Sequence, residues 1–222
     1  VCKLGHHELV VTASIGIAVY PEDGREFEVL AQCADSAMFR AKESGRDSYR
    51  FFSSDMQARS LRVLQIENAL RSAVVLNQLA LHYQPQIGLR DGKLVGVEAL
   101  LRWHHPELGT VSPGEFIPIA EETGLITSLG WQVLDKSCAL LARLRAQGHD
   151  LTCSVNLSMR QFSEPDLIGD VVRTVAAHGL PATAIRLEIT ESLVANAEHV
   201  IDAVMRDLHG RGLRIALCSS AP

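Results

Sequence analysis

The sequence lacks any apolar run that approaches the roughly 18 consecutive residues needed to span a bilayer. It has no CxxC pair and no Cys/His spacing typical of a zinc site, and its five cysteines are an odd number. Basic residues are not in excess either, because the formal net charge is −5. These absences argue against a membrane-spanning segment, a disulfide scaffold and a protein that coats nucleic-acid phosphates. Reduced thiols in a cytoplasmic protein are the simplest interpretation.

The 222 residues, 47% hydrophobic and 21% charged, are typical of one or two globular domains. Residues 1–11 lack the apolar core and cleavage site of a signal peptide, and they resemble the interior of a domain. We therefore expect further chain upstream, including a sensory domain in the parent protein, and a membrane anchor is left open.

The first third of the chain predicts a strand, a helix and a second strand. Residues 9–20 alternate with the period of a half-buried strand, and a PEDG turn follows at residues 21–24. Apolar residues then recur at helical spacing over residues 27–41, and Gly45 lies where the helix is expected to stop. Residues 46–52 can return as an edge strand. Composition alone indicates only an α+β fragment.

Two segments of this region, TASIGIAVYPEDG and ADSAMFRAKESGRDSYRFF, resemble the carboxyl-terminal end of a GGDEF domain, the diguanylate cyclase family. We therefore interpret residues 1–54 as the carboxyl-terminal fragment of such a domain. In that family the phosphate- and metal-binding loop lies upstream, so no cyclase residue is assigned here. Asp35, Lys42 and Arg46 are interpreted as charges on a solvated helix face.

Residues 55–78 contain no proline or glycine and predict a linker helix. From residue 79 onward, strands and helices alternate, which favours βα units around a parallel sheet. The predicted strands are residues 79–87, 93–103, 151–158, 185–192 and 213–217, and the predicted helical stretches are residues 118–144, 166–178 and 197–209.

Polar side chains occur near the carboxyl ends of these strands, where a β/α barrel carries its chemistry. They are Glu98, Arg102, Asn156, Glu188 and Glu191. Taken alone, an asparagine after a strand is usually a turn or cap residue, and a glutamate there is usually solvated. Oxygen donors from three successive strands instead favour a hard cation such as Mg²⁺ or Mn²⁺.

Four motifs, YQPQI, GVEALLRWHHPELGTVSPGEFIPIAEETGLI, SVNLSMRQF and RLEITES, resemble the EAL domain of cyclic di-GMP phosphodiesterases. With the GGDEF segments they indicate a tandem GGDEF–EAL signalling protein, with residues 79–222 as the amino-terminal part of the EAL domain. The resemblance implies an α/β fold: a TIM-like β/α barrel with one strand reversed. It also implies metal-dependent hydrolysis of cyclic di-GMP to linear pGpG.

The resemblance also implies roles for single residues. The family's metal ligands match Glu98, Asn156 and Glu188, and its dinucleotide contacts match Gln84 and Arg102. Glu191 matches the glutamate that steadies the loop over the site. Two divalent ions can bridge the scissile phosphate and acidify an attacking water, and an arginine can pair with phosphate oxygens.

The resemblance ends after LRIAL. The family continues with DDFGTGYSSL, whereas this sequence reads CSSAP, so that Cys218 stands in place of a metal-binding aspartate. The catalytic lysine of the family comes later still, whereas the last lysine here is Lys136. A barrel of this class needs roughly 250 residues. We therefore expect an incomplete barrel and a truncated chain that is inactive alone.

Three hypotheses remain open from the sequence. The chain is an incomplete cyclic di-GMP phosphodiesterase, a non-catalytic module that binds cyclic di-GMP or a protein partner, or a remnant without a stable fold. Intact Gln84 and Arg102 permit the binding module. A homodimer through the EAL domain is also left open.

Overall fold

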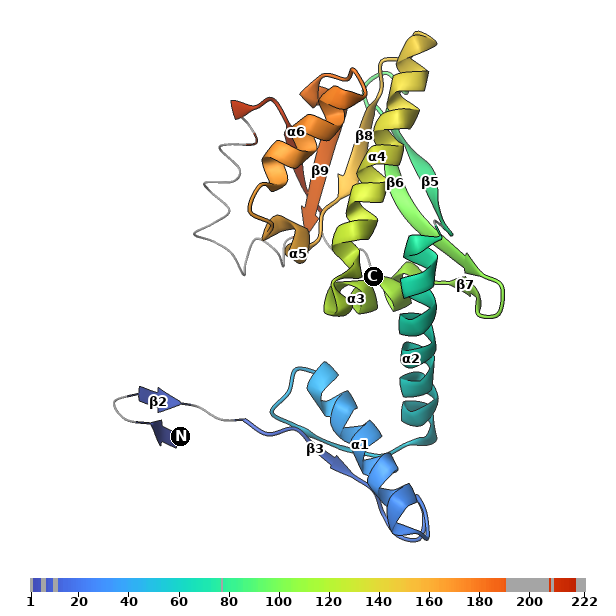
Figure 1. The fold of residues 1–222 in the computed structure, drawn as a ribbon, viewed down its shortest axis with the longest axis vertical. Coiled ribbons are helices and arrows are strands. Elements are labelled where there is room, and N and C mark those ends of the chain that lie inside the picture. The colour runs from blue at the N-terminus through green and yellow to red at the C-terminus, as the bar shows by residue number, and fades with distance from the viewer. Residues whose placement is uncertain are drawn as a thin grey trace. The chain divides into compact units, whose positions relative to one another are not determined.

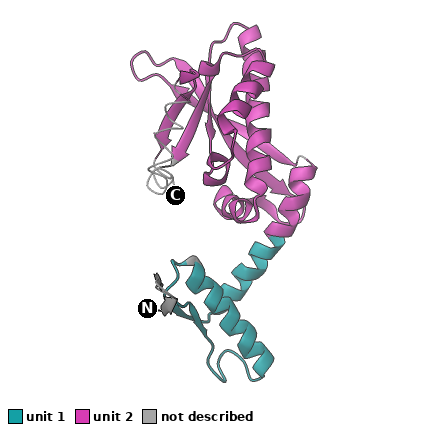
Figure 2. Ribbon diagram, turned by 60° about the vertical axis from the view of Figure 1, so that its left-hand side comes forward, with its two compact units in different colours: residues 1–65 teal, residues 66–222 magenta. Residues whose placement is uncertain are grey.

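The computed structural model describes residues 2–4, 7–9, 12–76, 78–190, 208 and 210–218. The secondary-structure elements are labelled in Figure 1. The chain forms two compact units, residues 1–65 and 66–222 (Figure 2). Within the described ranges, no helix combines the length and the apolar character that a membrane crossing requires.

The first unit contains two small sheets and one packed helix. Its elements are β1 (Cys2–Leu4), β2 (His7–Leu9), β3 (Ile15–Ile17), α1 (Phe27–Glu43), β4 (Tyr49–Phe51) and the first part of α2 (Ser54–Val75). β1 and β2 pair antiparallel, whereas β3 and β4 pair in parallel. Helix α1 packs so closely on β3 that a Cβ at Gly16 would lie 1.9 Å from the carbonyl oxygen of Ala34. Glycine is therefore required there.

β3 and β4 are both shorter than the strands predicted from the sequence. Beyond β3 the chain turns, because the amide of Val19 donates to the carboxylate of Asp23 at 2.6 Å. Before β4, Arg46 and Asp47 have positive φ angles of 61° and 45°, which belong to a turn and not to a strand. The period-two pattern thus extends past the residues that have a pairing partner.

The second unit is built on a six-stranded mixed sheet. Its strands are β5 (Leu79–Ile87), β6 (Leu94–His105), β7 (Gly109–Val111), β8 (Thr152–Asn156), β9 (Ile185–Thr190) and β10 (Arg214–Cys218). The order is β10-β9-β8-β6-β5, with β7 paired to the end of β6. β6, β8, β9 and β10 are parallel, and β5 is reversed. This confirms the predicted α/β class, with the short strand β7 antiparallel to β6 in addition to the reversed strand β5, in a sheet that is not closed within the described residues.

The helices of this unit are α3 (Pro113–Thr123), α4 (Leu125–Ala146), α5 (Met159–Phe162) and α6 (Leu167–Ala177), with a short 3₁₀ helix η1 (Ala182–Ala184). α3 begins earlier than predicted because Ser112 and Glu115 form a capping box. Gly124, at φ 81°, separates α3 from α4. Most of the helix predicted at residues 197–209 lies outside the described residues.

Helices α4, α5 and α6 cover one face of the sheet (Figure 1). The strand residues on that face are Val97, Ala99, Cys153, Val155, Ile185, Leu187 and Ile189, all buried. They pack against helix residues such as Leu134, Leu141 and Val171. Each fully buried aliphatic side chain contributes about 1.5–3 kcal/mol relative to an exposed one. This face therefore holds the core, and the alternate side chains of each strand point to the opposite face.

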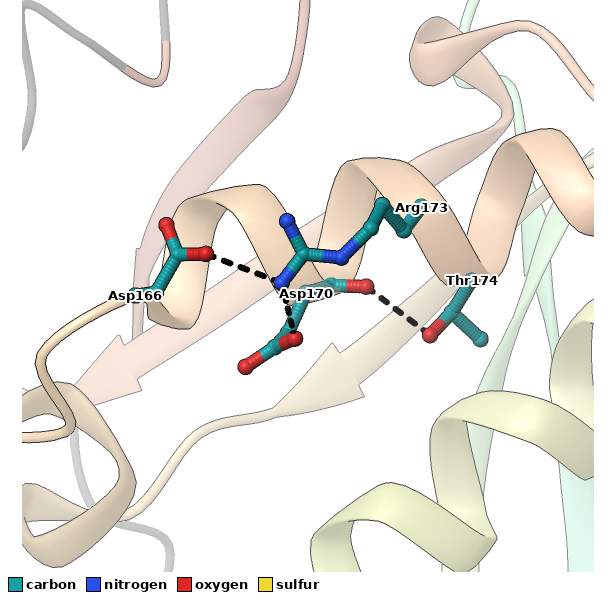
Figure 3. Close-up of polar contacts among 4 residues, drawn as sticks. All are labelled: Asp166, Asp170, Arg173 and Thr174. Atoms are coloured by element: carbon teal, nitrogen blue, oxygen red, sulfur yellow. Dashed lines mark hydrogen bonds and ion pairs between the residues drawn. The ribbon is translucent and has the colours of Figure 1, made fainter.

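The outer side of α6 is charged. Arg173 donates to the carboxylates of Asp166 and Asp170, and Thr174 donates to the backbone carbonyl of Asp170 at 2.8 Å (Figure 3). These ion pairs are largely solvent-exposed. Surface pairs of this kind contribute little to stability, so α6 is held mainly by its buried apolar face.

Two buried thiols make the stability of this core depend on pH. Burial raises the pKa of Cys138 to about 12 and that of Cys153 to about 11. In the unfolded chain a thiol titrates near about 8.5, so each thiol stabilises the fold below that pH and loses its contribution as pH rises toward the folded pKa.

We therefore expect the free energy of unfolding to fall from pH 8 to pH 10.5. Each thiol contributes up to about 1.4 kcal/mol per pH unit. In urea unfolding, Cys138→Ala should be less stable than the wild type at pH 8, but its free energy of unfolding should fall less steeply as the pH rises. Leu141→Ala removes buried volume but no titrating group, so it should lower the free energy of unfolding by the same amount at pH 8 and at pH 10.5. An unchanged pH slope in Cys138→Ala would contradict the assignment.

Candidate functional site

The face of the sheet opposite the core carries a set of polar side chains in register. Gln84 of β5 pairs with Glu98 of β6, and Glu98 pairs with Ser154 of β8. Two residues further along β8, Asn156 pairs with Glu188 of β9. Side chains paired across neighbouring strands point to the same face. Five polar residues from four strands therefore share one face.

A hydrogen bond joins two of the predicted metal ligands. The side-chain amide nitrogen of Asn156 donates to Oε1 of Glu98 at 2.9 Å. This bond crosses from β8 to β6, and it turns the amide oxygen of Asn156 away from the Glu98 oxygen that accepts the proton. Asn156 is exposed, and Glu98 and Glu188 are half-buried. The oxygen atoms are therefore accessible to a ligand.

The strand geometry explains why Glu98 belongs to this cluster although β6 continues to His105. Parallel pairing between β6 and β8 ends at Ala99 with Val155, so Glu98 lies at the carboxyl end of the parallel part of β6. Asn156 is the last residue of β8. The rest of β6 pairs only with the antiparallel strands β5 and β7. Both groups thus reach the same edge of the parallel sheet.

The remaining candidates lie at different distances from this pair. Arg102 is four residues beyond Glu98 on the same face of β6, and its Nη1 donates to the carbonyl of Leu101 at 2.8 Å. Glu188 lies one strand away from Asn156 in register. Glu191 lies outside the described residues. The structure thus joins Glu98 to Asn156 directly and places Gln84 and Glu188 beside them in register.

Cys218 ends β10 on the same face of the sheet. Ala216 pairs with Glu188, and Cys218 follows two residues later, opposite Thr190. The thiol of Cys218 donates to the carbonyl of Ile189 at 3.5 Å. Cys218, which stands in place of the family's aspartate, therefore lies two residues further along the strands than Glu188.

The two carboxylates act on a common point of β8. Burial is the main cause of the raised pKa of Cys153, and the charges of Glu188 and Glu98 both add to it. Cys153 directly precedes Ser154 in β8. A thiolate at Cys153 would be repelled by carboxylates on both neighbouring strands, β6 and β9.

Among the residues that the structure describes, no three His, Cys, Asp or Glu side chains gather closely enough to hold a metal ion. The described donor set has two carboxylates and one amide, so a cation here depends on the amide oxygen of Asn156 as well as on carboxylates. Amide and carboxylate oxygens are suitable ligands for hard divalent cations.

Sequence reasoning missed one polar pair at the base of this face. Nε2 of Gln86 donates to the hydroxyl of Ser154 at 3.2 Å, across the intervening strand β6. Ser154 is completely buried. The signal was present in the sequence, because Gln86 and Ser154 each precede or follow a predicted site residue by two positions, the period of a strand face.

Comparison with known proteins identifies both parts of the chain. The EAL domain family matches residues 67–220, and the GGDEF domain family of diguanylate cyclases matches residues 2–48. The bifunctional diguanylate cyclase/cyclic di-GMP phosphodiesterase MucR of Pseudomonas aeruginosa is 40% identical over 97% of the chain. The cyclic di-GMP phosphodiesterase PdeR of Escherichia coli is 34% identical over the same share. The chain covers 32% of each of these relatives.

Solved structures agree with this similarity. A structure titled as the PaMucR phosphodiesterase in complex with c-di-GMP has a TM-score of 0.66 and 36% identity, over 71% of this chain and 66% of that one. The FimX EAL domain from Pseudomonas aeruginosa, bound to c-di-GMP, has a TM-score of 0.61 and 27% identity, over 72% of this chain and 64% of that one. The chain thus belongs to the EAL domain family, preceded by a GGDEF segment as in bifunctional GGDEF–EAL proteins.

Proposed function

We propose that residues 79–222 form a cyclic di-GMP site of the phosphodiesterase type, which hydrolyses cyclic di-GMP to pGpG in the competent family members. The observation that supports it best is the hydrogen bond between Asn156 and Glu98, with Glu188 in register beside it on an exposed polar face. The relatives named as phosphodiesterases support the same reaction. In the proposed division, residues 1–54 are the GGDEF fragment and residues 55–78 the linker.

The donor set fits a divalent cation, and phosphodiesterases of this family are generally metal-dependent. Glu98, Glu188 and the amide oxygen of Asn156 would hold Mg²⁺ or Mn²⁺, because all three offer hard oxygen donors. When bound, the cation supplies a water of lowered pKa and stabilises charge on the phosphate. Asn156 contributes by pairing its amide nitrogen with Glu98, which leaves its oxygen for the cation.

The nucleotide contacts come from the two edges of this cluster. Gln84 is exposed beside Glu98, so its amide can donate to and accept from a guanine edge or a phosphate. Arg102 offers a guanidinium group that pairs with phosphate oxygens. Glu191 is proposed to steady the loop over the site, as the family resemblance implies.

Cys218 favours a second function, in which this chain binds the dinucleotide without turning it over. A thiol is a softer ligand than a carboxylate and suits Mg²⁺ poorly. Cys218 lies opposite Thr190, two residues beyond Glu188, and its thiol supplies no fixed negative charge to the cluster. We therefore expect binding to survive in this chain and hydrolysis to be lost.

The cellular setting is proposed from the same features. The buried residues Cys33, Cys138 and Cys153 are free thiols, as expected in a reducing compartment, and we assign the chain to the cytoplasm. A homodimer through the EAL domain and an upstream sensory domain are supported only by the family resemblance.

Calorimetry with cyclic di-GMP tests the proposed site. We expect binding in the presence of Mn²⁺, at least about tenfold weaker binding with EDTA or in Glu98→Gln, and no pGpG by chromatography. Glu107→Gln, in the turn between β6 and β7, is the matched control and should bind like the wild type. Equal affinity with EDTA and in Glu98→Gln would refute a metal-dependent site, and rapid pGpG formation would refute the loss of turnover.

A charged oxygen donor at position 218 should strengthen cation binding. Cys218→Asp places a carboxylate one register step beyond Glu188, so we expect Mn²⁺ affinity, measured by electron paramagnetic resonance, to rise about tenfold. Cys218→Ser keeps the size of the side chain without the charge and should leave the affinity near that of the wild type. Equal affinities for Cys218→Asp and Cys218→Ser would show that this position does not face the cation.

A further inference from the structure

We infer that Gln86 and Ser154 position the carboxylate of Glu98, a role that rests on the proposed function of Glu98 as a metal ligand. The two residues touch neither the dinucleotide nor the cation in this account. They act through the side-chain conformation of Glu98 and through its hydrogen bond to Asn156.

The sheet register brings the pair beneath Glu98. Gln86 pairs with Gly96, two residues before Glu98 on β6, whereas Ser154 pairs with Glu98 itself. The amide of Gln86 therefore crosses β6 diagonally to reach the Ser154 hydroxyl, 3.2 Å away. The bond links the two strands on either side of β6, next to the Glu98 side chain.

Gly96 leaves the space through which Gln86 passes. A Cβ on Gly96 would lie 3.2 Å from Oε1 of Gln86, 2.7 Å from the carbonyl oxygen of Thr152 and 2.6 Å from its hydroxyl oxygen. A side chain at position 96 would clash with Thr152 and would also crowd the end of the Gln86 side chain. This steric crowding explains why a glycine, Gly96, stands at the start of the motif GVEALLRW.

Burial makes the bond between Gln86 and Ser154 costly to lose. Ser154 is 0% exposed, and a buried hydroxyl without a partner costs about 1–3 kcal/mol. With Ser154 beside Glu98 and Gln86 on the amino-terminal side of Glu98, the Glu98 carboxylate extends toward Asn156, at the carboxyl end of β8. There it accepts a hydrogen bond from the side-chain amide nitrogen of Asn156, which leaves the amide oxygen for the proposed cation.

A purely structural role would have a different signature. If the bond only tied β5 to β8, its loss would lower the melting temperature without changing the side-chain amide of Asn156. Thr152→Val is the matched control, because the Thr152 hydroxyl also joins β8 to β6, through the carbonyl of Val95 at 3.4 Å, but on the far side of Gly96 from Glu98.

The test is side-chain amide NMR of the whole chain, followed by Mn²⁺ titration. In Gln86→Leu and Ser154→Ala we expect the Asn156 amide proton shifts to move toward those of Glu98→Ala, and Mn²⁺ affinity to fall about tenfold. Ser154→Thr, which keeps the hydroxyl, should restore both. Thr152→Val should leave both unchanged, whatever its melting temperature.

The outcomes separate the two proposals. Unchanged Asn156 signals in folded Gln86→Leu and Ser154→Ala would overturn the positioning role, even if stability fell. A second outcome is that the Asn156 signals shift in those variants while the wild-type chain binds neither Mn²⁺ nor cyclic di-GMP. That outcome would retain the positioning of Glu98 and overturn the proposed function instead.

Discussion

The register of the sheet in the second unit is the constraint on which the site depends. On β6, β8 and β9, the core residues Val97, Val155 and Leu187 directly precede the site residues and point to the opposite face. Because a shift by one residue would turn every side chain to the opposite face, burial of these apolar groups also fixes the polar face. The hydrogen bond between Asn156 and Glu98 exists only in this register, so the packing of α4 and α6 on the far side supports the geometry of the site.

The site has layers along the strand direction. Gln86 lies nearest the amino-terminal side of β6, Ser154 and Glu98 lie level with each other, and Asn156 and Glu188 lie two residues further along β8 and β9. Rigid strands carry all of these groups, which keeps the spacing of the oxygen donors fixed without a cation. Such preorganisation is what a binding site for a doubly charged ion requires.

Much of this arrangement could be predicted from the sequence because the strands β5, β6 and β9 carry long apolar motifs with polar residues at set positions. The contact between Glu98 and Asn156, 58 residues apart, needed the sheet order and could only be inferred from the family resemblance. The two-residue spacing from Gln84 and Asn156 places Gln86 and Ser154 on the site face, but their hydrogen bond across β6 could be found only from the sheet order. The sequence predicts too long a strand at β3, because the alternation of apolar and polar residues continues through Val19, where the chain already turns toward Asp23.

The most direct test of the proposed metal site is a crystal structure of the chain with Mn²⁺, with the ion located by its anomalous scattering. We expect an anomalous peak at the polar face, about 2.0–2.3 Å from oxygen atoms of Glu98 and Asn156 and within reach of Glu188. A structure that retains the sheet but shows the ion elsewhere, or no ion at saturating Mn²⁺, would contradict the metal-dependent site.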